Sequence, residues 1–518
     1  MDRFRRSCGG LESAIAHSFA TFGSPFRNEQ YNCFFLCNRS FNGGYDEPLR
    51  DTPRGGRQVD TEERSRRQAE AHRAAAVLRS REVATVALTF VDTAGITRVK
   101  AVPVARLVHA ATWGVGMSPV FDAFLSDDSI VAGRFAGGPV GDLRLFPDLS
   151  RLTVLAAQPG WAWAPVDRLA QDGSAHPLDQ RSLARRQVAQ LADGGYTARM
   201  AFEIEWAVGV DRPDSDDFIA AVRGPAYGFT RVVEASDYLH DLANALAAQG
   251  IEAEQIHPEY AEGQFEVSVV AEDPVAAADT FVLTRETIRA VSRRQGLRAS
   301  FSPKTVAGGV GNGGHVHLSL WAEGRNAFAD GRARYGMTEV ADRFSAGILD
   351  HLPALLAVGT ASAASYLRLI PQHWAGAFQA WGLENRETAL RFVTGSPGDS
   401  YRAANLEVKS FDESANPYLV VAGLIGAGLD GIAADRPLPE PLEVDPAGLG
   451  ETERSTRGIR PLPASLDDVA TAFEADDALT AAFGAELATT IVEVRRAEHA
   501  RFASASEEEI AVAVRWKY

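Results

Sequence analysis

Four short segments share an alternation of large apolar residues with polar ones, and no other feature of the chain limits its fold as strongly. The segments are RMAFEIEWAVG (199–209), GQFEVSV (263–269), HVHLSL (315–320) and NLEVK (405–409). Successive side chains of a β-strand point to opposite faces of a sheet. We therefore expect four half-buried strands, each with an apolar face and a face of Glu, His, Gln, Ser or Lys.

The first of these segments places two carboxylates on the same face. Glu203 and Glu205 alternate with the large apolar residues Phe202, Ile204 and Trp206. A solvated sheet face is the ordinary explanation of such alternation, and it usually mixes charges of both signs. These segments instead carry glutamates and histidines with almost no Lys or Arg, which favours a binding site over a solvated surface.

Five glutamates are expected on or beside this polar face: Glu203, Glu205, Glu259, Glu266 and Glu407. At an effective dielectric constant near 20, two like charges ~4 Å apart repel by roughly 4 kcal/mol. The carboxylates are therefore either far apart or bound to divalent cations. Glutamate oxygens combined with the imidazole of His315 favour Mg²⁺ or Mn²⁺ over zinc.

The composition is ordinary for a large globular protein. The chain has 518 residues, of which 46% are hydrophobic and 23% charged, and its net charge of −16 argues against a nucleic-acid partner. It contains no run of about 18 apolar residues that could span a membrane and no secretory signal at its start. All three cysteines lie within the first 37 residues, so a cytoplasmic location without disulfides is expected.

Three parts are expected along the chain. Residues 1–75 are rich in Arg, Gly, Ser and Asn, and are expected to be a mostly disordered extension or an over-extended start of translation, although residues 60–80 could form a helix. A small domain of strands and turns is expected over 82–165. A larger domain of alternating helices and strands is expected over 175–518, with Asp273 and Asn416 as helix N-caps.

Arginines and glycines occur in separate segments. Arg368 lies in YLRLIP, and Arg386 and Arg391 lie in ENRETALRF. Guanidinium groups bind phosphate and carboxylate in bidentate fashion, so these arginines suit an anionic substrate, although surface arginines would give the same pattern. The run VAGGVGNGGHVH, with Gly311 and Gly313, lets the backbone approach a ligand closely. This run is neither a Walker A loop nor a strand–GxGxxG–helix unit.

Taken in order, the motifs FEIEW, HPEYAEGQFEV, GGHVHLSL, YLRLIP, ENRETALR, NLEVK and ANPYL resemble the glutamine synthetase family over roughly residues 82–518. The resemblance implies an α+β protein with a small β-grasp-like N-terminal domain and a catalytic domain over 175–518. The catalytic domain would hold a curved antiparallel sheet surrounded by helices. Members of the family form ring-shaped homo-oligomers whose active sites lie between neighbouring subunits.

The same resemblance implies a reaction in which the γ-carboxylate of glutamate attacks the γ-phosphate of ATP. An amine then attacks the resulting γ-glutamyl phosphate. The implied ligands are Glu205, Glu259 and Glu266 for one Mg²⁺ or Mn²⁺ ion, and Glu203, His315 and Glu407 for a second. The other implied contacts are His317, Ser319, Arg391 and Arg402 for ATP, Arg368, Lys409, Gly311 and Gly313 for the substrate, and Arg386 and Arg391 for the transition-state charge.

The chain departs from the family pattern at the site of the attacking amine. Trp374 in RLIPQHWAGAFQAWG stands where glutamine synthetases carry a flap glutamate that helps to deprotonate ammonium. A tryptophan cannot act as a base, but its ring offers an apolar wall or a cation–π surface to an organic amine. The N-terminal domain normally donates an aspartate to this site, and Asp122 in MSPVFDAFLSDDS is the expected residue, with Asp127 and Asp128 as competing positions.

The last alternating segment departs from the family as well. Asn405 stands where an arginine is usual, and Lys409 replaces a second arginine, which keeps the charge but loses the bidentate fork.

These features together predict an ATP-dependent ligase that joins glutamate to an organic amine such as a polyamine or ethanolamine. Two alternatives remain open. One is a glutamine synthetase that uses ammonia, with Glu384 as a displaced flap acid. The other is a non-catalytic relative of the family, which the six intact metal ligands disfavour.

Overall fold

The computed structural model describes residues 61–518, and all structural statements below concern that part of the chain. Helix α1 (Thr61–Ser80) agrees with the helix predicted over residues 60–80. The extension expected over 1–75 is therefore helical from residue 61 onward. The rest of that prediction lies outside the described residues, as do the cysteines. No helix within 61–518 is both long and apolar enough to cross a bilayer.

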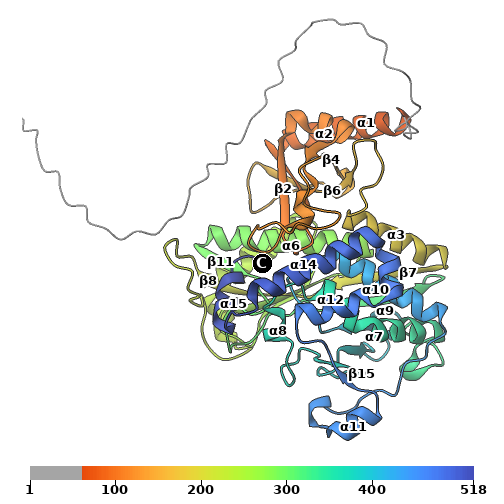
Figure 1. The fold of residues 1–518 in the computed structure, drawn as a ribbon. Helices are drawn as coiled ribbons and strands as arrows, with labels where there is room; N and C mark the ends of the chain where they lie inside the picture. The colour runs from red at the N-terminus through yellow and green to blue at the C-terminus, as the bar shows by residue number, and fades with distance from the viewer. Residues whose placement is uncertain (1–60) are drawn as a thin grey trace, which may run out of the picture. The chain divides into compact units, whose positions relative to one another are not determined.

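The strands that follow α1 form one mixed sheet (Figure 1). Its elements are β1 (Thr85–Val91), β2 (Thr97–Pro103), α2 (Leu107–Trp113), β3 (Val115–Met117), β4 (Leu143–Pro147), β5 (Thr153–Val154) and β6 (Trp161–Leu169). The strand order is β2-β1-β6-β4-β3, with β5 also on β6, and only the pair β1 and β6 is parallel. Helices α1 and α2 cover it, and Leu78, Val86, Leu107 and Ala164 are buried in its own apolar core.

Two further sheets carry the four alternating segments. The first has the order β11-β8-β10-β9, and the second β13-β12-β17-β16-β15 with β7 also paired to β12. Their bounds are β7 (Tyr196–Phe202), β8 (Ile204–Val210), β9 (Ala253–Pro258), β10 (Gln264–Val269), β11 (Leu297–Ser300), β12 (Val316–Ala322), β13 (Arg325–Asn326), β15 (Trp381–Leu383), β16 (Leu390–Val393) and β17 (Asn405–Val408). All these pairs except β15 with β16 are antiparallel.

The segment 199–209 was predicted as one strand, and this prediction is wrong. Strand β7 ends at Phe202 in one sheet, and β8 begins at Ile204 in the other. The side-chain alternation nevertheless continues through the break, so Phe202, Ile204 and Trp206 are at most 3% exposed. Alternation in the sequence reports which way side chains point. It does not report that the hydrogen-bond partner changes at Glu203 from β12 to β10 and β11.

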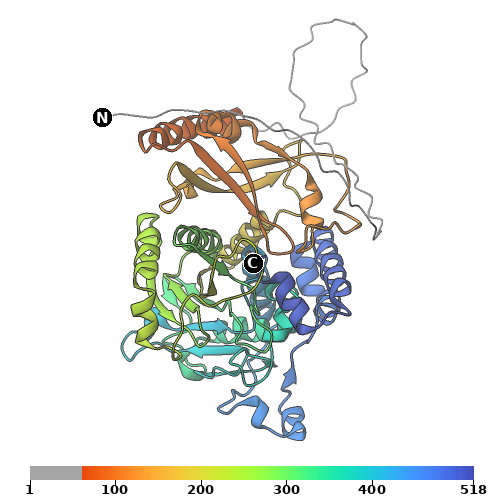
Figure 2. The same ribbon diagram turned by 90° about the vertical axis from the view of Figure 1, so that its left-hand side faces the viewer.

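Helices surround these sheets. Their bounds are α3 (Gln180–Asp193), α4 (Phe229–Glu234), α5 (Ser236–Ala248), α6 (Pro274–Arg294), α7 (Glu339–Gly359), α8 (Ser365–Arg368), α9 (Ser400–Ala403), α10 (Pro417–Ala433), α11 (Glu451–Thr456), α12 (Leu466–Glu474), α13 (Asp477–Phe483), α14 (Ala485–Phe502) and α15 (Glu507–Val514). Asp273 caps α6 and Asn416 caps α10, as predicted. The blue C-terminal helices and the yellow-green helix α5 lie on opposite sides of the strands (Figure 2).

The turn between β1 and β2 is hydrogen-bonded to Asn416, the N-cap of α10, and to Arg495 of α14. The Asn416 side chain donates to the carbonyls of Val91 and Asp92, and Arg495 donates to the carbonyl of Thr93 at 3.0 Å. Asp92 and Thr93 are fully buried. The N-terminal sheet is therefore held at the segment that leads from β17 into α10, immediately after the last of the predicted metal ligands.

Candidate active site

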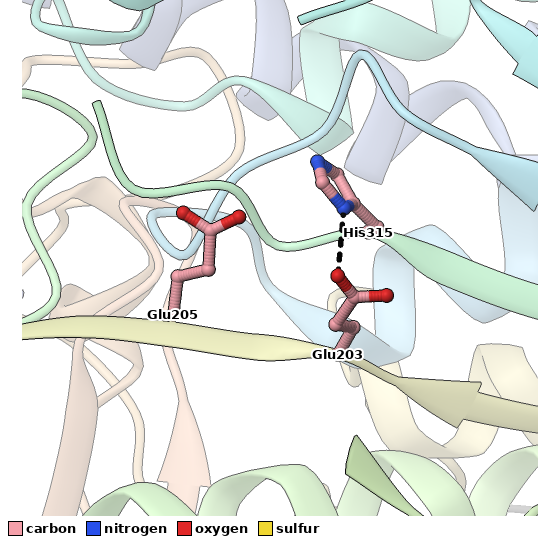
Figure 3. A group of neighbouring side chains, drawn as sticks. All are labelled: Glu203, Glu205 and His315. Atoms are coloured by element: carbon pink, nitrogen blue, oxygen red, sulfur yellow. Dashed lines mark hydrogen bonds and ion pairs between the residues drawn. The ribbon is translucent and has the colours of Figure 1, made fainter. Parts of the chain in front are cut away.

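The break between β7 and β8 places Glu203 where the two sheets meet. Its backbone N–H donates to the carbonyl oxygen of His315 at 2.9 Å. Glu205 lies two residues further on, in β8, opposite Glu266 of β10. Figure 3 shows both carboxylates on the same side of the backbone, with Glu203 pointing toward His315. The shared face predicted for the two glutamates is confirmed.

One cluster joins Glu203 to residues of β17 and of the segment that leads into and along β12. His315 Nδ1 lies 3.2 Å from Glu203 Oε1 and 3.4 Å from Glu407 Oε1. His317, directly opposite Glu407 in the sheet, places Nε2 3.0 Å from Glu203 Oε2. Its Nδ1 lies 2.9 Å from the side-chain oxygen of Asn405, which orients the ring. Two imidazoles and two carboxylates thus converge from different strands.

A second cluster lies between β9 and β10. His257 Nδ1 is 3.4 Å from Glu259 Oε1, and its Nε2 is 3.2 Å from Glu266 Oε1. The hydroxyl of Tyr227 donates to Glu259 Oε2 at 2.7 Å. Neither His257 nor Tyr227 was predicted. The sequence carried a signal for His257, because it stands two residues before Glu259 and so shares its face, but Tyr227 comes from a loop without such periodicity.

Three groups of side chains could each hold an ion: Glu203, Glu205 and His315; Glu203, His317 and Glu407; and His257, Glu259 and Glu266. All six predicted ligands occur in these groups, and two histidines join them. The division of the six into three ligands for each of two ions stays a prediction.

The pKa values of the carboxyl groups in the site are shifted in opposite directions. Burial, followed by the charges of Glu203 and Glu205, raises the pKa of Glu266 far above its ordinary value. At Glu203 the charge and hydrogen bond of His315 outweigh burial and hold the pKa well below its ordinary value. The site therefore gathers more carboxylates than its own cations neutralise, and divalent cations fit such a donor set.

The glycine run packs against Glu205 and Arg368. The N–H of Gly313 donates to Glu205 Oε2 at 2.8 Å, and Arg368 Nη2 lies 3.2 Å from His315 Nε2. A β-carbon on Gly313 would lie 2.6 Å from His315 Nε2, and a β-carbon on Gly311 would lie 2.6 Å from Cγ of Arg368. A larger residue at either position would displace these groups, and Gly313 brings a backbone donor into the site.

Two cations flank Glu407. Lys409 Nζ lies 3.1 Å from Glu407 Oε1, and Arg391 Nη1 lies 3.0 Å from Oε2. Against the effect of burial, the charge of Lys409 holds the pKa of Glu407 at about 2. Arg391 also pairs with Glu384, the residue considered as a displaced flap acid. Lys409 and Arg391 would therefore both lie within reach of an anion bound beside the first cluster.

Four predicted site residues lie apart from these contacts. Arg386 and Arg402 are exposed, and Ser319 is buried within β12. Trp374 is 56% exposed, in the loop that follows α8. Their contacts with substrates stay predictions.

Asp122 belongs to none of these clusters within the subunit, and its predicted place at the amine site of a neighbouring subunit stays a prediction. Asp122 is fully buried, both of its oxygens accept from Arg168 at 2.8 Å, and His176 lies 3.3 Å away. Its carboxylate therefore forms a buried ion pair within its own subunit, and breaking such a pair is strongly destabilising. Of the competing positions, Asp127 is paired with an arginine of α14, and Asp128 is 60% exposed.

A family model described as glutamine synthetase, catalytic domain, matches residues 177–512. This chain belongs to the glutamine synthetase family. The gamma-glutamylpolyamine synthetase of Streptomyces coelicolor is 57% identical over 434 residues, which cover 84% of this chain and 93% of that protein. The glutamine synthetase of Halobacterium salinarum is 31% identical over 427 residues, which cover 81% of this chain and 91% of that protein.

Solved structures agree with this assignment. A crystal structure of a glutamine synthase homolog matches with a TM-score of 0.75 and 33% identity, over 84% of this chain and 99% of that one. The predicted α+β fold, with its curved antiparallel sheet surrounded by helices, is thereby confirmed, and so is the assignment of the chain to the ligases of this family. Enzymes of the family use ATP and divalent metal ions.

Proposed function

We propose that this member of the family joins the γ-carboxyl group of glutamate to the nitrogen of an organic amine at the expense of ATP. The observation that carries the proposal is the contrast within one site. All six predicted metal ligands lie together, whereas the loop over residues 369–376 contains Trp374 and no carboxylate. The gamma-glutamylpolyamine synthetase relative supports an amine with more than one amino group as the substrate.

In the proposed reaction an oxygen of the γ-carboxylate attacks the γ-phosphorus of ATP, and the bond to the bridging oxygen breaks to release ADP. The ammonium form of the second substrate loses a proton, and its nitrogen attacks the acyl carbon of γ-glutamyl phosphate. Inorganic phosphate leaves with one former carboxylate oxygen. A second proton leaves as the amide forms.

Two divalent cations, Mg²⁺ or Mn²⁺, are the proposed cofactors. The oxygen-rich ligand set with imidazole suits these ions. When bound, such ions neutralise charge on the transferring phosphoryl group. Arg368 is proposed to hold the glutamate carboxylate, and Lys409 and Arg391 to stabilise charge on the phosphoryl oxygens.

An ammonia-dependent glutamine synthetase is the less supported alternative. It needs an acid close to the incoming ammonium, and Glu384 is instead paired with Arg391. The ring of Trp374 offers nothing to ammonia that it does not also offer to an alkylammonium, whose carbon chain gains additional apolar contact. A non-catalytic relative is disfavoured by the complete set of metal ligands.

We further propose that the protein forms a ring-shaped homo-oligomer with active sites between subunits, and that it acts in the cytoplasm. Glutamate, ATP and a small amine are the proposed partners, and neither nucleic acid nor membrane is among them.

The test measures phosphate release from ATP in the presence of Mg²⁺ and glutamate. It compares ammonium, ethanolamine, putrescine, spermine and simple monoamines as the acceptor. The proposal expects stimulation by organic amines that exceeds stimulation by ammonium. Glu266→Gln should abolish turnover, whereas Glu262→Gln, at a side chain 53% exposed in the neighbouring turn, should retain it. Stimulation by ammonium alone would establish glutamine synthesis instead.

A further inference from the structure

The loop that carries Trp374 begins and ends at the candidate site. It starts at Arg368, whose guanidinium faces the metal-ligand cluster. At its other end the carbonyl of Gly376 accepts from the hydroxyl of Ser410 at 2.8 Å, and a β-carbon on Gly376 would lie 3.2 Å from Cβ of Lys409. Because consecutive Cα atoms are ~3.8 Å apart, Trp374 lies within about 8 Å of Gly376. The backbone of Trp374 therefore lies close to the candidate site.

The backbone of this loop adopts a conformation that bulky residues avoid. Gln372 has φ of 63° and Trp374 has φ of 53°, both in the left-handed region, followed by Gly376 at 68°. Two non-glycine residues in this region within three positions are costly, and such geometry persists only where neighbouring contacts hold it. Trp374 is also 56% exposed, so burial of its ring does not supply the holding force.

The contact that holds the loop is the carboxylate of Glu387. Its Oε1 accepts the backbone N–H of Trp374 at 3.1 Å. Glu387 is itself fixed, because Asn385 Oδ1 accepts its N–H and the Asn385 amide donates to two carbonyls of the segment 442–445. Gln372 in turn donates to Asp445. The Glu387 carboxylate thus supports the strained backbone at Trp374, and Asp445 holds the side chain of Gln372.

We propose that Glu387 is a positioning residue that fixes the Trp374 indole at the rim of the site, and that this pair selects an organic ammonium over the ammonium ion. The inference rests on the proposed function. An indole held at one orientation presents its face to the cationic head and its edge to the carbon chain of the amine. An indole on a released loop loses this advantage, while the metal-ligand cluster remains intact.

The test compares Glu387→Ala, Glu387→Gln and Trp374→Ala with the unchanged protein, with putrescine and ammonium as alternative acceptors. Glu387→Ala should raise KM for putrescine about tenfold, the size expected of one cation–π and apolar contact, and leave KM for ATP and glutamate within about twofold. Glu387→Gln keeps an acceptor oxygen and should lose less than about threefold. Glu443→Ala, which removes an exposed glutamate of the adjacent segment, is the matched control.

A double-mutant cycle gives the deciding result. If Glu387 acts through the indole, Glu387→Ala adds less than about twofold in the Trp374→Ala background. Equal losses with putrescine and ammonium, or fully additive losses, would overturn the inference and leave Glu387 as a merely structural anchor. Trp374→Ala alone keeps the test decisive if Glu387→Ala does not fold, because an unchanged acceptor preference would refute the selecting role. Absence of amine-dependent turnover in the unchanged protein would refute the proposed function itself.

Discussion

Replacing Gly313 by alanine should disable the site and leave the protein folded. The added β-carbon would lie 2.6 Å from His315 Nε2, 2.9 Å from Glu205 Oε1 and 3.0 Å from Nη2 of Arg368. Ordinary contact begins at 3.4 Å, so the imidazole must retreat by about 0.8 Å and the carboxylate by about 0.5 Å. Three groups that the site needs are displaced by one methyl group.

The size of the effect follows from these displacements. A misplacement near 1 Å at a reacting centre costs about 10²-fold in rate, or about 2.7 kcal/mol of activation free energy. Overpacking in a filled region costs about 1–3 kcal/mol of the free energy of unfolding. The nearest atoms belong to side chains and not to the backbone, so we expect the fold to absorb the change.

The assay is phosphate release at saturating ATP, glutamate and amine, with the melting temperature measured in parallel. Gly309→Ala is the matched control, because its β-carbon would meet nothing closer than the Val306 carbonyl oxygen at 3.1 Å. We expect kcat to fall about 100-fold for Gly313→Ala and less than about threefold for Gly309→Ala. Retention of kcat within about threefold by Gly313→Ala would refute the close approach of the glycine run to the ligand cluster.

Three further predictions concern stability. Asp122→Asn should lower the free energy of unfolding by about 3 kcal/mol through loss of the buried pair with Arg168, and an unchanged melting temperature would contradict this structural contribution. His351 lies 2.6 Å from Asp476 and 3.0 Å from Asp430, and these partners raise its pKa although burial opposes them. A raised histidine pKa stabilises the fold below the unfolded pKa and loses this effect as pH rises through the folded pKa. The melting-temperature gap between the unchanged protein and its His351→Gln variant should therefore be larger near about pH 6 than near about pH 8, and a gap that grows with pH would contradict the assignment. Mg²⁺ or Mn²⁺ at about 100 times its Kd should stabilise the fold by about 2.7 kcal/mol, and EDTA should reverse this; an unchanged melting temperature would argue against metal at these ligands.

Local periodicity explains what could be predicted from the sequence. The alternation of Phe202, Ile204 and Trp206 with two glutamates depends only on strand geometry, so the buried and ligand-bearing faces followed directly. Helix N-caps such as Asp273 depend only on the next three residues, so they could be predicted in the same way. Predicting the six metal ligands also required the order of the motifs, because no local rule brings β8, β10 and β17 together.

The remaining features depend on contacts between distant residues. The buried pair of Asp122 with Arg168 was not predicted, because Arg168 lies far along the chain and nothing near residue 122 signals that pairing. The change of sheet at Glu203 has no side-chain signature, because alternation continues across it. The support of Trp374 by Glu387 required the backbone conformation of an exposed loop, which has no periodic pattern.

The most direct measurement follows the γ-carboxylate oxygens of glutamate through the reaction. The enzyme is incubated with ATP, Mg²⁺, glutamate labelled with ¹⁸O at both γ-carboxylate oxygens, and the most active amine of the panel, and products are identified by mass spectrometry. The proposed reaction predicts a γ-glutamyl amide of that amine that retains one ¹⁸O, and inorganic phosphate that carries the other. Unlabelled phosphate, or glutamine as the only amide formed when ammonium is also present, would contradict γ-glutamyl transfer to an organic amine.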